Sequence, residues 1–381
     1  MNQATLSFAA PTTLPADPAN RVGFHIGWDH AHHGLVPPAE LLHQGTPVTQ
    51  GWMVGKAVFG RRTLATARST RQWLALRLLA WRRGIHFEIE QVTANHLAQL
   101  HTDRCPVTRR TLGGAAGQAD AAGVDRLNPQ AGYAAGNLVT LSHAASQAWL
   151  GVNVMQAMRQ ARAQEAGAPD KAGLDASAWW RLAALRSYAT PLPFHEAAQV
   201  PLAVLPPNRV RMLNAVQGLQ ALVTNLFMTP GWSARCRALG ALLPAHTSRH
   251  DFNLFVGALA PRVLEAGAEP RALRMALEDA WLHERVQRRW QHLVLCLGEA
   301  ATKDLLERAI AAGLAVRRTV NHAPDQAVAG WALERGGRLA LVEGHYHPVG
   351  QGVGLAGEDE SSIQIGLFER KVAVHAHLAL Q

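Results

Sequence analysis

The most specific arrangement of polar residues lies between residues 105 and 149. Two short apolar runs, 124–127 and 137–141, flank a glycine-rich turn and predict a β-hairpin, and a helix is expected to begin near residue 142 or 143. Such a ββα unit can direct an acidic side chain from its first strand and a polar side chain from its helix toward one divalent metal ion. Asp125 and Ser146 occupy these two places, and Asn137 can pin the hairpin from the second strand. The pattern therefore predicts a candidate metal site.

These residues resemble the HNH, or ββα-metal, endonuclease superfamily, nearest to its endonuclease VII-like branch. In that superfamily the first strand ends in Asp-His, the turn contains a Gly-aromatic step, the second strand opens with Gly-Asn, and the helix supplies His or Asn. The resemblance covers about residues 101–150 of the 381. The matching positions are Asp125-Arg126, Gly132-Tyr133, Gly136-Asn137 and Ser146, with Cys105 as the upstream cysteine.

The resemblance implies a protein that acts on DNA or RNA, and in particular a metal-dependent DNA endonuclease that uses Mg²⁺, Mn²⁺ or Zn²⁺. The catalytic residues that it implies are Asp125, Arg126 and Asn137. The metal ligands would be Asp125, His143 and Ser146, and the structural residues Cys105, Gly132, Tyr133 and Gly136. The opening phrases GFHIGWD and GWMVGK also resemble uncharacterised bacterial proteins that carry this core, a resemblance that implies no function.

Two positions depart from the superfamily pattern. Arg126 stands where the general base is expected, and a guanidinium keeps its proton in this pH range, so it cannot activate water. Ser146 is a poorer ligand for a divalent metal than His or Asn. His143, or His101 with Asp103, could supply a missing group. Two interpretations stay open: a metal-dependent endonuclease with Arg126 on a phosphate, or a non-catalytic module that binds nucleic acid or another protein on a degenerate scaffold.

The same residues have structural interpretations. Asp125 can stabilise the hairpin, and Asn137 can tie the turn to the strand through side-chain hydrogen bonds. Gly132 and Gly136 can simply permit a positive φ. Cys105 is expected to be a buried small residue rather than a nucleophile.

A basic segment precedes the ββα unit. Lys and Arg outnumber Asp and Glu 37 to 28, a net charge of +9, and only four of the 37 are lysine. Arginine-rich chains suit a nucleic-acid partner, and they also arise in GC-rich genomes. The candidate phosphate-binding residues are Lys56, Arg61, Arg62, Arg68, Arg71, Arg77, Arg82 and Arg83, and Trp52, Trp73 and Trp81 lie among them. The alternative is an amphipathic helix with core tryptophans and solvated arginines.

Three histidine-rich stretches invite a metal interpretation. They are Asp29, His30, His32 and His33; His345 and His347; and His375 and His377. Turn-capping or surface histidines are the alternative for the first group, and the glutamate of a cupin-like site is missing after His347. No phosphate-binding loop or dinucleotide fingerprint is present, so no nucleotide cofactor is expected.

No apolar run approaches the roughly 18–20 residues that span a bilayer, and the first residues lack the pattern of a secretory signal. We therefore expect a cytoplasmic protein with no membrane partner. Three widely spaced cysteines argue against a disulfide framework. The sequence leaves the oligomeric state open.

Long Ala/Leu/Arg segments with helical period predict a predominantly helical α+β fold. The expected parts are a flexible lead-in (1–20), a basic Trp/Arg-rich N-terminal region (21–95), the ββα-metal-like core (96–167), a helical domain (175–318) and a small C-terminal antiparallel β domain (319–381). Within them we expect irregular backbone with short helical pieces over 23–60, a helix over 61–83 that Gly84 ends, a linker over 191–207, and a bundle of five or six helices over 175–190 and 208–317.

Overall fold

The computed structural model describes residues 17–340, apart from 116, 266, 268 and 316–323. Within that part of the chain, fifteen α-helices accompany one antiparallel sheet of two strands. The prediction of a predominantly helical α+β fold is therefore confirmed. Most of the expected C-terminal β domain, its histidine pairs and most of the lead-in lie outside the described residues. The described part of that domain, 324–340, holds a short α-helix (Pro324–Ala327) and a 3₁₀ helix (Leu333–Arg335) in place of the predicted strands. None of the described helices combines the length and apolar character needed to cross a membrane.

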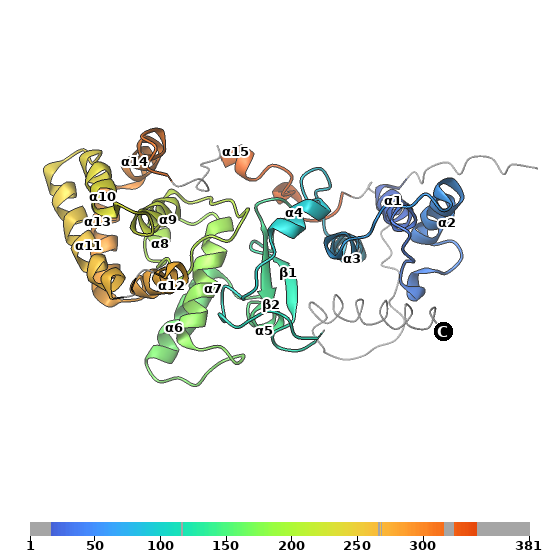
Figure 1. The fold of residues 1–381 in the computed structure, drawn as a ribbon, viewed down its shortest axis with the longest axis horizontal. Helices are drawn as coiled ribbons and strands as arrows, with labels where there is room; N and C mark the ends of the chain where they lie inside the picture. The colour runs from blue at the N-terminus through green and yellow to red at the C-terminus, as the bar shows by residue number, and fades with distance from the viewer. Residues whose placement is uncertain (1–16, 116, 266, 268, 316–323, 341–381) are drawn as a thin grey trace, which may run out of the picture.

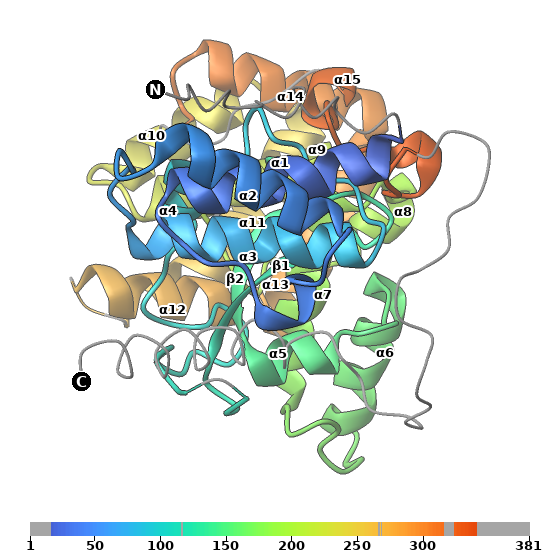
Figure 2. The same ribbon diagram turned by 90° about the vertical axis from the view of Figure 1, so that its right-hand side faces the viewer.

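Three helices form one end of the molecule (Figure 1). They are α1 (Pro18–His32), α2 (Pro47–Phe59) and α3 (Arg68–Arg82), with a short 3₁₀ helix at Ala39–Leu41. α1 packs against both α2 and α3, and the three lie together when the molecule is seen from this end (Figure 2). The prediction over 23–60, irregular backbone with short helical pieces, underestimates the helix content, because α1 and α2 cover most of that stretch.

Glycines on both helices explain this difference. The phrases GFHIG and GWMVG each place two glycines four residues apart on one helical face. A Cβ on Gly27 would lie 1.9 Å from the Val48 carbonyl oxygen, and a Cβ on Gly51 would lie 1.8 Å from the Phe24 carbonyl oxygen. The glycines therefore let the two backbones touch, and contact between the helices outweighs the low helix propensity of glycine.

Gly51→Ala is expected to separate α1 from α2 and to lower the free energy of unfolding by about 1–3 kcal/mol. Gly257→Ala is the matched control, because Gly257 also lies within a helix and a Cβ there would meet nothing within 4 Å. That control should be neutral or stabilising by up to about 1 kcal/mol. Urea unfolding of both variants checks the contrast, and equal stabilities would contradict the close contact.

The helix predicted over 61–83 starts later than expected, at Arg68, and ends at Arg82 shortly before Gly84, which has a φ of 62°. The backbone N–H of Leu64 donates to the His32 carbonyl at 2.9 Å, and the Thr66 hydroxyl donates to the His33 carbonyl at 2.6 Å. These bonds hold the segment along the end of α1, so it does not join α3.

The predicted hairpin and helix are present near the centre of the chain. β1 (Ala122–Arg126) pairs with β2 (Leu138–Ser142), and α5 (His143–Ala148) follows directly. Asp125 lies opposite Val139, and Val124 lies opposite Thr140. Even-numbered side chains therefore face α3 and α4 (Ala94–Gln99), whereas odd-numbered ones face the main core.

The rest of the described chain is largely helical. The helices are α6 (Val154–Glu165), α7 (Ala176–Ala189), α8 (Phe194–Ala197), α9 (Ala215–Phe227), α10 (Trp232–Ala241), α11 (His246–Leu264), α12 (Pro270–Ala280), α13 (Glu284–Leu297), α14 (Glu299–Ala311) and α15 (Pro324–Ala327), with a 3₁₀ helix at Leu333–Arg335. Within the described residues, the stretches 175–190 and 208–317 hold seven helices, α7 and α9 to α14, one more than the five or six predicted.

The segment 191–207 is not a linker, so that prediction is wrong. Val200, Leu202 and Val204 are buried in the main core, which runs from Cys105 to Trp331. The prolines keep this segment out of regular structure, but its apolar side chains still pack. Residues on both sides of the segment therefore share one core.

The chain returns to the hairpin after the helical part. Trp331 is fully buried, and its indole N–H donates to the Ala135 carbonyl at 3.0 Å. Its own carbonyl accepts from the Gly132 N–H at 2.7 Å. Further on, the Leu339 N–H donates to the Gly84 carbonyl at 2.8 Å. Residues 331–339 therefore tie the hairpin turn to the end of α3.

Candidate functional site

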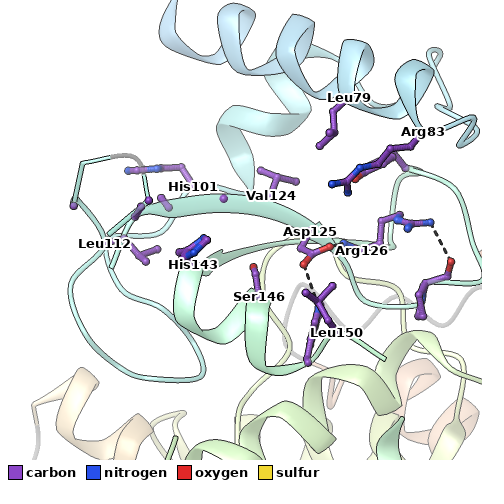
Figure 3. A pocket seen from close by; sticks show the side chains of 18 of the residues that line it. Leu79, Arg83, His101, Leu112, Val124, Asp125, Arg126, His143, Ser146 and Leu150 are labelled. Carbon is purple, nitrogen blue, oxygen red and sulfur yellow. Dashed lines mark hydrogen bonds between the residues drawn. The ribbon is translucent and has the colours of Figure 1, made fainter. Parts of the chain in front are cut away.

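A cavity of about 190 Å³ lies along the free edge of β1. Consecutive residues 121–126 all line it, although neighbouring side chains on a strand point to opposite faces. A cavity that touches every residue of a strand must follow the strand's edge. Figure 3 shows Arg83 reaching the cavity from the end of α3, and His143 and Ser146 reaching it from α5. The cavity therefore brings together four of the predicted catalytic and metal-binding residues, Asp125, Arg126, His143 and Ser146.

Asp125 is half-buried at this edge, and both of its carboxylate oxygens are engaged. Oδ1 accepts a bond from the Arg126 backbone N–H at 2.7 Å, and Oδ2 accepts one from the Trp149 indole at 3.1 Å (Figure 3). The first bond satisfies a backbone donor that has no partner on β2. Asp125 therefore combines the predicted structural role with a position beside the cavity.

Arg126 is held by the hairpin turn. Its Nη1 donates to the carbonyls of Pro129 and Ala131, at 3.0 and 2.7 Å, and its guanidinium lies 5.1 Å from the centre of the Tyr133 ring. Its Nε is buried without a hydrogen-bond partner among the described residues. Arg126 thus stabilises the turn, and part of its positive charge still faces the cavity.

Asn137 closes the hairpin from the fully buried start of the second strand. Its amide nitrogen donates to the carbonyls of Asn128 and Gly132, at 3.1 and 3.0 Å, and its amide oxygen accepts from the Asn128 N–H at 2.7 Å. These three bonds saturate most of the side chain. Asn137 is therefore placed to organise the hairpin and lies away from any reacting group in the cavity.

Glycines and Cys105 complete the structural set. Gly136 has a φ of 91°, as predicted, whereas Gly132 is required by space, because a Cβ there would lie 2.6 Å from the His86 carbonyl oxygen. Tyr133 is buried, which raises the pKa of its hydroxyl, and Arg83 lies within hydrogen-bonding reach of that hydroxyl. Cys105 is buried and its Sγ accepts from the Ser142 hydroxyl at 3.2 Å, consistent with the structural interpretation.

The predicted metal ligands differ in burial. Ser146 is buried and His143 half-buried, and both line the cavity with Asp125. His101 is exposed, and its Nε2 lies 3.6 Å from an Asp103 oxygen. Across the described residues, the one set of three His, Cys, Asp or Glu side chains with ligand atoms within 4.8 Å of one another lies elsewhere, on α11 and α13. Asp125 and the two histidines therefore do not form such a set.

Arg186 is a buried charge in the cavity wall that was not predicted from the sequence. This α7 side chain is 7% exposed, and its Nη2 donates to the Trp149 carbonyl at 2.9 Å. Its guanidinium lies 4.7 Å from the centre of the Trp149 ring, and its Nε is buried without a partner in the described structure. Burial lowers the pKa of Arg186 to about 10, an effect that the Asp125 carboxylate partly opposes. Arg186 therefore remains charged at neutral pH.

A glycine-rich loop forms another wall that the sequence analysis did not single out. Gly113, Gly114 and Gly117 line the cavity, so backbone rather than side chains faces it there. The described lining residues include four arginines and two histidines but only one carboxylate. These residues are Arg68, Arg83, Arg126, Arg186, His101, His143 and Asp125.

The basic segment divides into two groups. Arg77 is buried on α3 and forms a short ion pair with Asp29 of α1, so its predicted contact with phosphate is wrong. Arg82 lies 4.0 Å from Glu40. The remaining residues are exposed or half-exposed: Lys56, Arg61, Arg62, Arg68, Arg71 and Arg83.

The tryptophans of this segment serve the fold. The indoles of Trp52, Trp73 and Trp81 donate to the carbonyls of Leu35, Val92 and Ala19, at 3.0, 2.7 and 2.7 Å. Each ring is partly buried. These contacts favour the alternative interpretation, in which the three tryptophans belong to the core.

A comparison of the chain with known protein families, with curated proteins and with solved structures gave no match. The geometry of the cavity therefore carries the functional argument.

The first histidine cluster has a structural role. Asp29 forms an ion pair with Arg77, and His32 stacks on Phe59 with ring centres 4.2 Å apart. His30 is buried, and its Nδ1 lies 2.7 Å from the Ile26 carbonyl oxygen. Burial lowers the pKa of His30 to about 4 from 6.5. His30 is therefore neutral in the folded protein at neutral pH.

This pKa predicts acid sensitivity. As the pH falls below 6.5, the unfolded chain takes up a proton at His30 before the folded protein does, so the stabilisation present above pH 6.5 is lost as the pH approaches 4. The loss attributable to His30 is at most about 3 kcal/mol. Urea unfolding between pH 7 and 4.5 should show a shallower decline for His30→Met, whereas exposed His250→Met should follow the native curve.

Proposed function

We propose that the protein binds nucleic acid, with a backbone phosphate in the cavity along β1. The observation that carries this proposal is the excess of guanidinium groups over carboxylates in the cavity wall, including buried Arg186. A buried cation without a matching anion is costly, and an anionic ligand would compensate it. Arginine forks match phosphate oxygens in geometry as well as in charge.

The surface beside the cavity supports an extended anionic ligand rather than a single small anion. Arg68 opens α3 and lines the cavity, and exposed Arg71 lies one turn further along the same helix. Arginines in a row along a helix can contact successive phosphates. The glycine-rich wall also allows a polymer backbone to approach closely.

Binding of labelled single-stranded DNA, duplex DNA and RNA, measured by fluorescence anisotropy over a range of salt concentrations, tests the proposal. The native affinity should fall steeply with salt because counterions are released. Arg68→Ala with Arg83→Ala should weaken binding to all sequences and lower the salt slope by about one per lost contact. Arg237→Ala on α10 is the control for each single substitution, since it removes one positive charge from an exposed site at the far end of the molecule (Figure 1).

Arg186→Met separates ligand binding from a structural role. If Arg186 contacts phosphate, this variant should lose affinity while the protein stays folded, because removal of a desolvated charge offsets the lost bond to the Trp149 carbonyl. Equal binding by the native protein and by all cavity variants would refute the proposal.

A second candidate function is metal-dependent cleavage of the bound strand, as an HNH-like endonuclease. It is favoured by one observation: Asp125, His143 and Ser146 line the same cavity, as the family resemblance would require of metal ligands. These residues would hold the ion, which would polarise the phosphate and activate water. Arg126 would bind phosphate charge.

Incubation with linear, branched and single-stranded DNA in Mg²⁺, Mn²⁺ or Zn²⁺ tests this candidate. Native protein should cut at least one substrate, and Asp125→Asn should bind the same DNA with similar affinity but fail to cut it. Asp170→Asn, which changes an exposed carboxylate outside the cavity lining, is the control and should keep full activity. Binding without cutting under every condition would leave the non-catalytic binding function.

A further inference from the structure

Three side chains of different chemistry meet on the surface of the helical part, away from the cavity. His292 and Cys296 lie one turn apart on α13, and Asp251 lies on α11, which packs against α13. His292 Nε2 is 3.6 Å from Asp251 Oδ2, and Cys296 Sγ is 3.9 Å from the ring nitrogens of His292. All three ligand atoms lie within 4.8 Å of one another.

We infer that Asp251, His292 and Cys296 bind a zinc ion. Thiolate, imidazole and carboxylate are the protein ligands of zinc, with bond lengths of about 2.0–2.3 Å, so tetrahedral ligand atoms are separated by about 3.3–3.7 Å. The observed separations are close to this range, and a small change of side-chain rotamer would bring them into it. Magnesium and calcium are excluded as preferred ions, because both select oxygen ligands.

The position of the site determines its coordination. His292 and Cys296 are exposed, whereas Trp290, Leu293 and Val294 face the core from the same helix. Only three protein ligands converge among the described residues, so water takes the fourth position. The ion would link α11 to α13 and stabilise the packing of these helices.

Thiol reactivity gives a direct test. Cys105 and Cys236 are buried and Cys296 is exposed, so a thiol reagent applied to native protein reports on Cys296. One equivalent of Zn²⁺ should protect this thiol and raise the midpoint of thermal unfolding, because zinc binds the folded state. Protection should weaken as the pH falls, since protons compete for the thiolate and the imidazole.

Variants identify the ligands. Cobalt bound to native protein should show a thiolate-to-cobalt charge-transfer band, which Cys296→Ser should abolish. His292→Ala and Asp251→Ala should each weaken zinc binding at least about tenfold. His250→Ala removes an exposed histidine next to Asp251 and should leave the affinity unchanged.

Two results would overturn the inference. One is a Cys296 thiol that reacts at the same rate with and without Zn²⁺. The other is an equal number of zinc equivalents bound by native protein and by Cys296→Ser, which would place the metal at other histidines. Neither result bears on the cavity, whose proposed ligand is tested without this site.

Discussion

The three hydrogen bonds of the Asn137 amide are the interaction on which the candidate site depends. They close the turn between β1 and β2 and bring the turn carbonyls to where Arg126 can bind them. The closed turn also receives Trp331 from a distant part of the chain. A two-stranded hairpin is at best marginally stable alone. Here it gains stability because cores on both faces and the returning segment hold it.

Both faces of the hairpin are covered by packed side chains, so only the edge of β1 is open to a ligand. The even face is covered by α3 and α4 and the odd face by the main core, so a ligand can reach β1 only along its unpaired side. The helices that cover the faces then supply charges at the edge, Arg83 from the end of α3 and Arg186 from α7. The positive cavity is therefore a product of the tertiary packing.

The sequence predicts local structure at this site better than its surroundings. The hairpin, the following helix and the organising role of Asn137 follow from short apolar runs, turn residues and amide chemistry, all of which act over a few residues. Arg186 lies 61 residues after Asp125, so only the fold places it in the wall. One sequence signal was available: α7 is apolar nearly all round, so an arginine there must be buried. The helices α1 and α2 were not predicted, because glycines spaced four residues apart stabilise a helix only where a second helix packs against them.

The contacts and charge of Arg126 suit phosphate binding better than catalysis at the cavity. Its guanidinium donates to two turn carbonyls and stacks near Tyr133, so it serves the hairpin and contributes charge, but it cannot accept a proton from water. A hydrolytic function would need its base from His143 or His101, which lie on other parts of the wall. Phosphate binding needs no replacement for Arg126, because every arginine in the wall already has the required positive charge. The cavity thus meets the electrostatic requirement for binding with the residues in place, whereas cleavage requires a base from a different element.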